Sequence, residues 1–379
     1  MWKILKGDGI TDDLDAFKKA LSSQDNIFVP KGRYYLGDTL IIPNGKSLFS
    51  FPPCGTNPPS GTVLLFLASL AKCVQIGIGT SYESGIFDGF IIERNGIYVD
   101  KTIVPEDSIG LECNNTMGAI VRNVYIIGHA IGLKSNWGIT NWFEHISTTC
   151  CKKYYVEIDT TPECRFLSCR FGQNGSTDVQ GQAYICATGG DTDNISNGPN
   201  TIIFNNCHFN LGGGVSLEKW FDVSKITSGH VSEIDTFQFD NCYIESVNIG
   251  LYADETVNSI SFLQMNNYIV LSNKDFWGVN ALTIIDNVQM SNCLIKSNFS
   301  INTNKQINFL NISNVTVFGK FTLNTPSIGE EINSVVNVSN IYAYQGITLD
   351  GKYALLTFNG NSAAGYSNNA IISGISLKI

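Results

Sequence analysis

Phe204-Asn205-Asn206-Cys207-His208-Phe209 is a six-residue stretch whose pattern returns along most of the chain. The pattern reads apolar, polar, Asn, small apolar, variable, apolar, and we call it the frame. It recurs in Phe239-Asp240-Asn241-Cys242-Tyr243-Ile244 and Met290-Ser291-Asn292-Cys293-Leu294-Ile295, and further copies begin at Phe87, Val121, Phe143, Phe166, Met265, Ile312, Val338 and Ile372. Successive copies lie 22 to 38 residues apart, and the short separations cluster near two dozen. A period of this size is typical of solenoid proteins.

Apolar and polar residues alternate inside each copy of the frame, which predicts strands rather than helices. One coil of a parallel β-helix has three short strands and three turns, and this accounts for a period of about two dozen residues. We therefore predict an all-β fold, a single-stranded parallel β-helix of about ten to twelve coils.

The frame also predicts where its side chains point. The first, fourth and sixth positions should face inward and stack on their counterparts one coil away, about 4.8 Å distant. The Asn at the third position should lie in the bend between two strands, because Asn tolerates a left-handed backbone and its amide can bond to the next Asn along the stack. This interpretation gives a structural ladder of Asn123, Asn206, Asn241, Asn267, Asn292, Asn314 and Asn340.

The eleven cysteines fit the same scheme. Cys169, Cys207, Cys242 and Cys293 occupy the fourth frame position, where Val124 stands in another copy. They are therefore expected to behave as small buried hydrophobes, as reduced thiols rather than disulfides, metal ligands or nucleophiles.

Charge and hydropathy exclude two classes of partner. The formal net charge is −9, with 33 acidic and 24 basic residues and no cluster of Lys or Arg. This argues against a nucleic-acid partner. No apolar run reaches the length of a membrane-spanning helix, so no membrane partner is expected either.

The segment Gly7 to Leu21, GDGITDDLDAFKKAL, predicts a short helix at the start of the chain. Thr11-Asp12-Asp13 would form its N-cap, and Leu14, Phe17, Ala20 and Leu21 would give it one apolar face. A solenoid exposes its core and unpaired strand edges at an open end, and such a helix can cover them.

GDGITDD (7–13), followed by NIFVPKGRYYLGDTLIIP (26–43), resembles the first segment of the pectate-lyase-like superfamily of right-handed parallel β-helices. The closest resemblance is to bacteriophage tailspikes that depolymerise polysaccharides. It implies a right-handed β-helix, with Val29 to Tyr34 as the first strand and its turn. It divides the chain into an N-terminal cap and first strand (1–40) and a β-helix (41–379).

The resemblance also implies a function. The partner would be a bacterial surface polysaccharide, capsule or O-antigen. The protein would be a homotrimer in a virion tail, made in the host cytoplasm and acting outside the cell.

Two consecutive separations of the frame are long and predict loop insertions near 172–200 and 210–235. Function on a β-helix sits on such insertions and on outward positions, because only these leave the stack. Insertions on adjacent coils would form neighbouring walls of one groove. The first insertion contains Asp178, and the second contains Lys219, Trp220 and Asp222. Trp220 is expected to be exposed.

The fifth frame position forms an outward column beside these insertions: Arg170, His208 and Tyr243, with Glu245 two residues further on. Aromatic faces suit sugar rings, cations suit acidic sugars, and two carboxyls can cleave a glycosidic bond. The sequence therefore predicts a polysaccharide-binding groove that contains these side chains.

We expect a glycoside hydrolase that uses no metal and no other cofactor. Glu245 and Asp222 form the leading carboxyl pair, with Asp240 and Asp178 in reserve. The residues expected to bind sugar are Arg170, His208, Tyr243, Trp220 and Lys219.

Two alternatives stay open. The first is a polysaccharide lyase on the same fold, in which a base removes the proton next to a uronate carboxyl that Arg170, Lys219 or a calcium ion neutralises. The second is a spike that binds glycan without cutting it.

Overall fold

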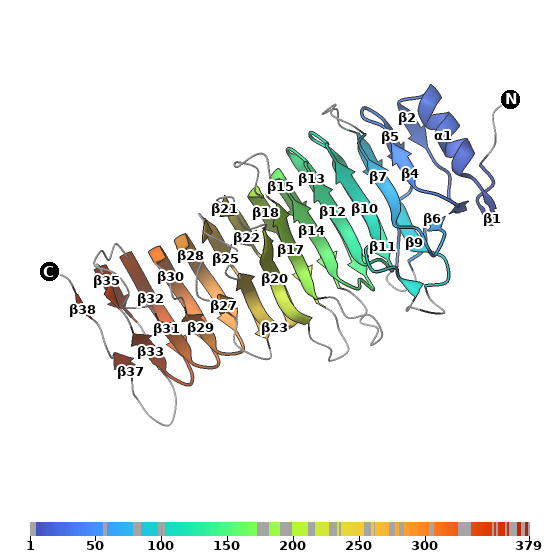
Figure 1. The fold of residues 1–379 in the computed structure, drawn as a ribbon. Coiled ribbons are helices and arrows are strands. Elements are labelled where there is room, and N and C mark those ends of the chain that lie inside the picture. Colours follow the sequence, from blue (N-terminus) through green and yellow to red (C-terminus); the bar gives the residue numbers. More distant parts are fainter. Residues whose placement is uncertain are drawn as a thin grey trace. The chain divides into compact units, whose positions relative to one another are not determined.

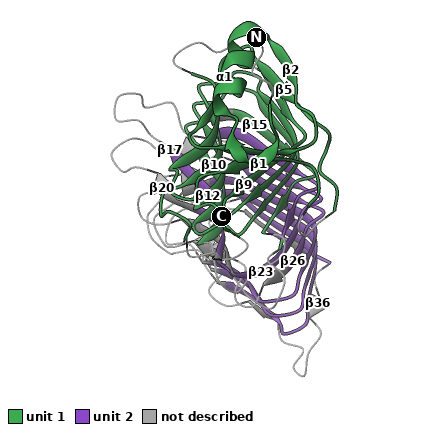
Figure 2. Ribbon diagram, turned by 90° about the vertical axis from the view of Figure 1, so that its right-hand side faces the viewer, with its two compact units in different colours: residues 1–185, 210–215 green, residues 186–209, 216–379 purple. Residues whose placement is uncertain are grey.

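The computed structural model describes most of the chain, in two compact units. Unit 1 comprises residues 1–185 and 210–215, and unit 2 comprises residues 186–209 and 216–379 (Figure 2). The described residues are 5–55, 59–78, 85–97, 100, 103–172, 182–189, 199–210, 217–226, 233–234, 236–253, 259–260, 262–272, 277–279, 284–302, 307–324, 335–350, 352–353, 355–360, 362–363, 370–372 and 376–377.

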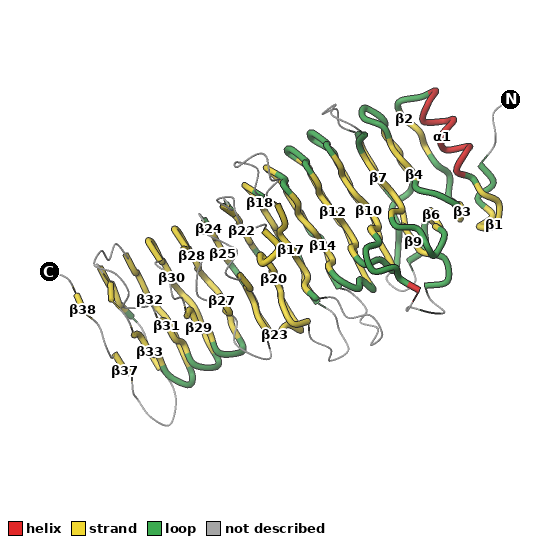
Figure 3. Tube along the Cα trace, viewed as in Figure 1, coloured by secondary structure: helices red, strands yellow, loops and turns green. Residues whose placement is uncertain are grey.

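Short strands make up nearly all of the described regular structure, and α1 (Leu14–Ser23) is the α-helix among them (Figure 3). The strands of unit 1 are β1 (Asp8–Asp12), β2 (Asn26–Phe28), β3 (Arg33–Leu36), β4 (Leu40–Ile42), β5 (Ser47–Phe49), β6 (Thr62–Phe66), β7 (Lys72–Ile76), β8 (Ile86–Asp88), β9 (Phe90–Arg94), β10 (Ile109–Asn114), β11 (Ile120–Ile127), β12 (Ile131–Asn136), β13 (Asn141–Thr149), β14 (Tyr154–Asp159), β15 (Pro162–Leu167) and β16 (Arg170–Phe171).

β17 (Ala183–Gly189) contains residues of both units. The strands of unit 2 are β18 (Asn200–Asn205), β19 (His208–Phe209), β20 (Leu217–Ile226), β21 (Glu233–Ile234), β22 (Phe237–Asp240), β23 (Tyr243–Ala253), β24 (Ser259–Ile260), β25 (Leu263–Asn266), β26 (Ile269–Ser272), β27 (Trp277–Val279), β28 (Ile284–Ile295), β29 (Phe299–Asn302), β30 (Ile307–Val317), β31 (Phe321–Asn324), β32 (Val335–Ala343), β33 (Ile347–Asp350), β34 (Lys352–Tyr353), β35 (Leu355–Asn359), β36 (Ser362–Ala363), β37 (Ala370–Ile372) and β38 (Ser376–Leu377).

Within each unit the strands pair in parallel with the equivalent strand of the next coil (Figure 1). In unit 1, β10 pairs with β12 and β12 with β14, so that Leu111, Leu133 and Val156 stack. In unit 2, β28 pairs with β30 and β30 with β32, so that Met290, Ile312 and Val338 stack. The predicted all-β parallel solenoid with one short N-terminal helix is therefore confirmed.

The inward positions predicted by the frame form the core. In the copy that begins at Phe204, the side chains of Phe204, Cys207 and Phe209 are fully buried. Phe204 also stacks on Phe239 of the next coil, with ring centroids 5.1 Å apart. All eleven cysteines are free thiols, and burial raises the pKa of the Cys293 thiol to about 12. The prediction that the stacked cysteines are small hydrophobes is confirmed.

The Asn at the third frame position takes the left-handed backbone at every predicted site. Its φ lies between 52° and 54° at Asn123, Asn206, Asn241, Asn267, Asn292, Asn314 and Asn340. Part of the amide ladder is present, because Asn340 donates to Asn314 at 3.0 Å and Asn314 donates to Asn292 at 3.1 Å. His145 and Ser168 adopt the same φ at this position of their copies, so the bend imposes the conformation and Asn is the side chain that suits it.

The helix α1 differs from prediction in two details. Asp13 is the N-cap residue, but its carboxylate accepts hydrogen bonds from the backbone N–H groups of Lys6 and Gly7 instead of capping the helix. The Leu14 N–H instead donates a hydrogen bond to the Asp12 carboxylate, at 3.0 Å. On the apolar face Ala16 is buried while Ala20 is only half-buried, so the face is rotated toward Ala16 relative to the prediction.

The division at residue 40 and the two insertions stay predictions. Much of the predicted insertions lies outside the described residues, since 173–181, 190–198, 211–216 and 227–232 are not described. β20, however, lies within the second of them, so part of that segment is strand rather than loop. Val29 to Gly32 also lie between β2 and β3, so the predicted first strand is interrupted there.

A buried cation lies inside unit 1. Arg94 is fully buried, and its guanidinium donates to the carbonyl oxygens of Gly128 at 3.0 Å and Leu70 at 2.9 Å. Another guanidinium nitrogen lies 3.1 Å from His129 Nδ1, so this ring nitrogen accepts and the proton of neutral His129 is on Nε2. Burial, and then the charge of Arg94, hold the pKa of His129 well below its usual value.

We expect Asn314→Ala to cost about 2 kcal/mol of unfolding free energy, because alanine pays for the left-handed φ and loses the ladder bonds. Asn314→Gly keeps the backbone conformation and should cost less than about 1 kcal/mol. Urea unfolding of both variants measures the difference. Equal losses would show that the bend does not demand a left-handed residue.

Unfolding free energy should fall as the pH drops below about 6.5, because His129 takes up a proton only when the chain unfolds. This histidine alone contributes a slope of at most about 1.4 kcal/mol per pH unit. His129→Gln should remove that part of the slope between pH 6.5 and 5. His145→Gln changes a side chain that is 56% exposed and should leave the slope unchanged. Identical slopes in the wild type and His129→Gln would contradict the assignment.

Candidate functional site

The structure brings three of the predicted site residues together in unit 2. His208 on β19 is exposed and lies opposite Tyr243 on β23, and their ring centroids are 5.7 Å apart. The Tyr243 hydroxyl donates to Glu245 Oε2 at 2.8 Å. Burial, and then the bond to Glu245, raise the pKa of Tyr243 to about 12. The predicted outward column is thus present over these two coils.

The leading carboxyl pair is not brought together. Asp222 on β20 lies opposite Tyr252, seven residues beyond Glu245 on β23. The register of β23 shifts between Glu245 and Val247, and the regular part from Val247 to Tyr252 alone spans about 16 Å, whereas the carboxyls of a glycosidase lie about 5–9.5 Å apart. Asp222 is also buried, 2% exposed, and accepts a hydrogen bond from Lys219 Nζ at 3.0 Å. Within one chain Asp222 and Glu245 therefore cannot act on the same bond.

Trp220 corrects a further expectation, because its indole is buried rather than exposed. It packs edge-on against Phe239, with ring centroids 4.6 Å apart, and contacts Phe209 and Tyr268. Trp220 was predicted to lie on a loop insertion, but it lies in β20 and faces the core. It therefore offers no face to a sugar ring.

The remaining predicted residues have separate positions. Asp240 accepts hydrogen bonds from Asn266 Nδ2 at 3.2 Å and Asn205 Nδ2 at 3.4 Å, so it contributes to coil stacking. Arg170 is exposed on β16 of unit 1, opposite Ser147. Asp178 lies outside the described residues.

Unit 1 carries a polar cluster that the sequence analysis missed. The outward positions of β10, β12 and β14 form three rows of two residues, and we call them the charged grid: Glu112 and Asn114, Lys134 and Asn136, Glu157 and Asp159. Strand register sets Glu112 opposite Lys134, and Lys134 opposite Glu157. The inward neighbours Leu133 and Ser135 are fully buried, so the grid is the outer face of these coils.

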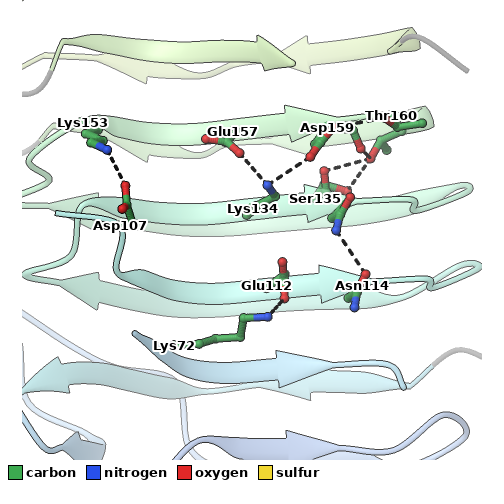
Figure 4. Close-up of polar contacts among 12 residues, drawn as sticks. Lys72, Asp107, Glu112, Asn114, Lys134, Ser135, Lys153, Glu157, Asp159 and Thr160 are labelled. Carbon is green, nitrogen blue, oxygen red and sulfur yellow. Dashed lines mark hydrogen bonds and ion pairs between the residues drawn. The ribbon is translucent and has the colours of Figure 1, made fainter. Parts of the chain in front are cut away.

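Lys134 is the centre of the grid. Its Nζ lies 2.7 Å from Glu157 Oε1 and 3.0 Å from Asp159 Oδ2, as Figure 4 shows. The two carboxylate oxygens are therefore no further apart than the sum of these distances. Glu112 on the next coil binds Lys72 of β7, which also donates to Gln75 at 3.0 Å. The lysines and acids thus alternate from coil to coil.

The two acids that share Lys134 differ in their surroundings. The side chain of Glu157 is 9% exposed and that of Asp159 is 26% exposed. Burial raises the pKa of Glu157 above its usual value, and the attraction of Lys134 offsets this only in part. Burial opposes the charge on Lys134, but the two carboxylates outweigh it and raise the lysine pKa. Lys134 keeps its charge because two carboxylates bind it.

This arrangement suits acid–base chemistry. A carboxyl whose pKa is raised by burial can hold a proton and donate it. Amide groups lie next to the acids, because Asn136 is in register with Asp159 and donates to Asn114 Oδ1 at 3.2 Å. Such amides can bond to sugar hydroxyls.

A signal for the grid exists in the sequence. Ile109-Gly110-Leu111-Glu112-Cys113-Asn114 and Ile131-Gly132-Leu133-Lys134-Ser135-Asn136 share Ile, Gly, Leu and Asn at the same positions. The fourth position holds an acid, Glu112, in the first copy and a base, Lys134, in the second. Tracing this second repeat would have found the grid.

Among the described residues, no group of three or more His, Cys, Asp or Glu side chains is arranged to hold a metal ion. No helix of the described chain is long and apolar enough to cross a membrane.

Sequence comparison gives little about the chain. No protein-family profile matches it. An alignment over 47 residues, which covers 11% of this chain and 4% of the relative, shows 45% identity to a non-secreted LysM effector from Penicillium expansum. So short a match says nothing about the rest of the chain.

Structural comparison shows the fold. The chain is similar to an exopolygalacturonase from Thermotoga maritima, with a TM-score of 0.50 and 12% identity over 94% of this chain and 90% of that one. It is equally similar to DFA-IIIase from Arthrobacter chlorophenolicus A6, with a TM-score of 0.50 and 11% identity over 99% and 97%. An N-terminal fragment of bacteriophage Phi29 gene product 12 has a TM-score of 0.46 and 13% identity over 98% and 72%.

At these identities the likeness concerns the fold alone. The chain has the right-handed parallel β-helix fold of the pectate-lyase-like kind, as its first segment predicted. This fold is shared with enzymes that act on carbohydrates.

We expect Lys134→Met to lower the unfolding free energy by about 2–3 kcal/mol at pH 7, because it leaves two carboxylates of low exposure unpaired. The loss should shrink as the pH falls toward 4, since Glu157, whose pKa is raised by burial, then becomes neutral. Chemical denaturation at pH 7 and pH 4 measures both effects. The control is Lys153→Met, which breaks an exposed pair with Asp107 and should cost less than about 1 kcal/mol. A loss for Lys134→Met no larger than this control would contradict the grid's energetics.

Proposed function

We propose that this chain is a glycoside hydrolase of the tailspike kind that depolymerises a bacterial surface polysaccharide, and that the charged grid is its active centre. One observation carries the proposal. Glu157 and Asp159 both bind the same Lys134 ammonium, at 2.7 and 3.0 Å, so their carboxyls lie close together on one outer face. Carboxyls about 5–5.5 Å apart are the pair that retaining glycosidases use.

The surroundings assign a role to each acid. Glu157 is the proton donor to the leaving oxygen, because burial raises its pKa. Asp159 is the nucleophile, because its side chain is the more exposed of the two. Lys134 holds both carboxyls in place, and the amides of Asn114 and Asn136 bond to sugar hydroxyls beside them.

The proposal extends to assembly and location. We propose a homotrimer in a virion tail, on the strength of the resemblance of residues 7–43 to tailspikes. The row of His208, Tyr243 and Glu245 then serves as a sugar-binding surface of unit 2. Arg170 and Lys219 remain proposed cation contacts for acidic sugars.

A second candidate function is a spike that binds glycan without cutting it. The observation that favours it is the pairing of the grid acids with lysines, since Glu112 binds Lys72 and Glu157 binds Lys134. Acids held in this way can also serve only to stabilise coil stacking. Activity measurements distinguish the two candidates.

The test follows reducing ends and ultraviolet absorbance on a panel of capsules and O-antigens. We expect the wild type to release reducing ends without new absorbance, and Glu157→Gln and Asp159→Asn each to lower the rate by about 10²–10⁴-fold. The rate should fall as the pH rises through the raised pKa of Glu157, because the donor then loses its proton.

Glu106→Gln is the control, since it changes an exposed acid of unit 1 that pairs with Lys152 outside the grid, and it should leave the rate within about threefold of the wild type. Loss of activity in Glu245→Gln with retention in Glu157→Gln would move the centre to the Tyr243 row. New absorbance would establish a lyase, and no cleavage with retained binding would establish the spike.

A further inference from the structure

Unit 2 has an outward row of side chains that crosses four strands. Ile269 on β26 lies opposite Leu294 on β28, Leu294 lies opposite Thr316 on β30, and Thr316 lies opposite Tyr342 on β32. Ile269 is 41% exposed and Tyr342 is 36% exposed. The row is therefore an apolar and aromatic strip on the outer face of these coils.

A second row lies two residues further along the chain, directly after the ends of β28, β30 and β32, and contains Lys296, Phe318 and Tyr344. Its register follows from the backbone, because the N–H of Phe318 bonds to the carbonyl of Ile295 and the N–H of Tyr344 bonds to the carbonyl of Val317. The two rows belong to one surface, because the ring of Tyr342 in the first contacts the ring of Tyr344 in the second.

The aromatic residues of the two rows touch one another. Phe318 and Tyr344 are stacked, with ring centroids 4.8 Å apart and ring planes 9° apart. Tyr342 meets Tyr344 edge-on, with centroids 4.9 Å apart. All three are large side chains that are 36–40% exposed. A contiguous exposed aromatic group is typical of a binding surface rather than of packing.

Among the described residues of these coils, the charges next to the rings are positive. Lys296 and Lys320 are exposed, and they lie next to Phe318 along the stack and along the chain. Within 284–302, 307–324 and 335–350 the acids are Asp286 and Asp350, and neither lies in the two rows. The surface therefore complements a negatively charged ligand, although the whole chain carries a net charge of −9.

We infer that Phe318, Tyr342, Tyr344, Lys296 and Lys320 form a platform that binds an acidic sugar of a polysaccharide. The rings provide apolar area and two phenol groups for a pyranose, and the lysines bind its carboxylate. The inference rests on the proposed function in taking a glycan as the ligand, and it adds that this glycan is anionic. It assigns binding, not cleavage, to this part of unit 2.

The test is titration calorimetry with polygalacturonate and alginate, and with dextran as the neutral chain. We expect the acidic polymers to bind and dextran to bind at least about tenfold more weakly, with affinity for the acidic polymers falling as NaCl rises. Phe318→Ala combined with Tyr344→Ala should weaken binding of the acidic polymers by about tenfold or more. Lys296→Gln combined with Lys320→Gln should weaken it and flatten its dependence on salt.

The control is Phe51→Ala, which removes one ring of the exposed Phe28–Phe51 pair in unit 1 and should leave binding unchanged. The lysine variant keeps all three rings, so it tests the platform even if the aromatic variant folds poorly. Unchanged binding in both double variants would overturn the platform, as would preference for dextran or for a single-stranded oligonucleotide. A trimer that dissociates on Phe318→Ala would also overturn it, because the surface would then be a subunit interface.

Binding is measured independently of cleavage. Wild-type binding without released reducing ends would contradict the proposed hydrolase activity and would leave the proposed platform standing. Cleavage together with binding that the platform variants leave unchanged would contradict the platform and would support the hydrolase activity.

Discussion

Parallel pairing in register from one coil to the next is the constraint on which the rest of the structure depends. Each strand must place its inward side chains directly above those of the previous coil, as Met290, Ile312 and Val338 do. The chain must therefore bend at the same point in every coil. Asn tolerates the left-handed backbone at these bends, and its amide donates a hydrogen bond to the Asn of the neighbouring coil.

The same constraint determines where chemistry can sit. Each outward position recurs in the next coil at the coil spacing, so side chains of successive coils lie next to one another. On unit 1 this produces the alternation of Glu112, Lys134 and Glu157, and on unit 2 the stack of Phe318 on Tyr344. In both cases residues more than 20 positions apart in the chain become neighbours because the register holds them.

Much of the fold could be predicted because the frame reports on the inward face, where packing leaves few choices. The sites were harder. Trp220 was assigned to a loop because a long separation was interpreted as an insertion, whereas β20 continues the coil with a pattern unlike the frame. Asp222 and Glu245 are near in sequence, but the register sets Asp222 opposite Tyr252. Glu157 and Asp159 were missed because their strand lies on another side of the coil from the frame, where the outward residues vary freely.

The hexapeptides that begin at Ile109 and Ile131 have one more consequence, which concerns the gene rather than the folded chain. The two hexapeptides occupy equivalent positions of adjacent coils, and Asn114 and Asn136 lie 22 residues apart. Unequal recombination between the two coding segments would delete or duplicate one whole coil and leave every remaining strand with a partner in register. A protein built in this way can change its length in steps of one coil while its ends and its other surfaces are inherited intact.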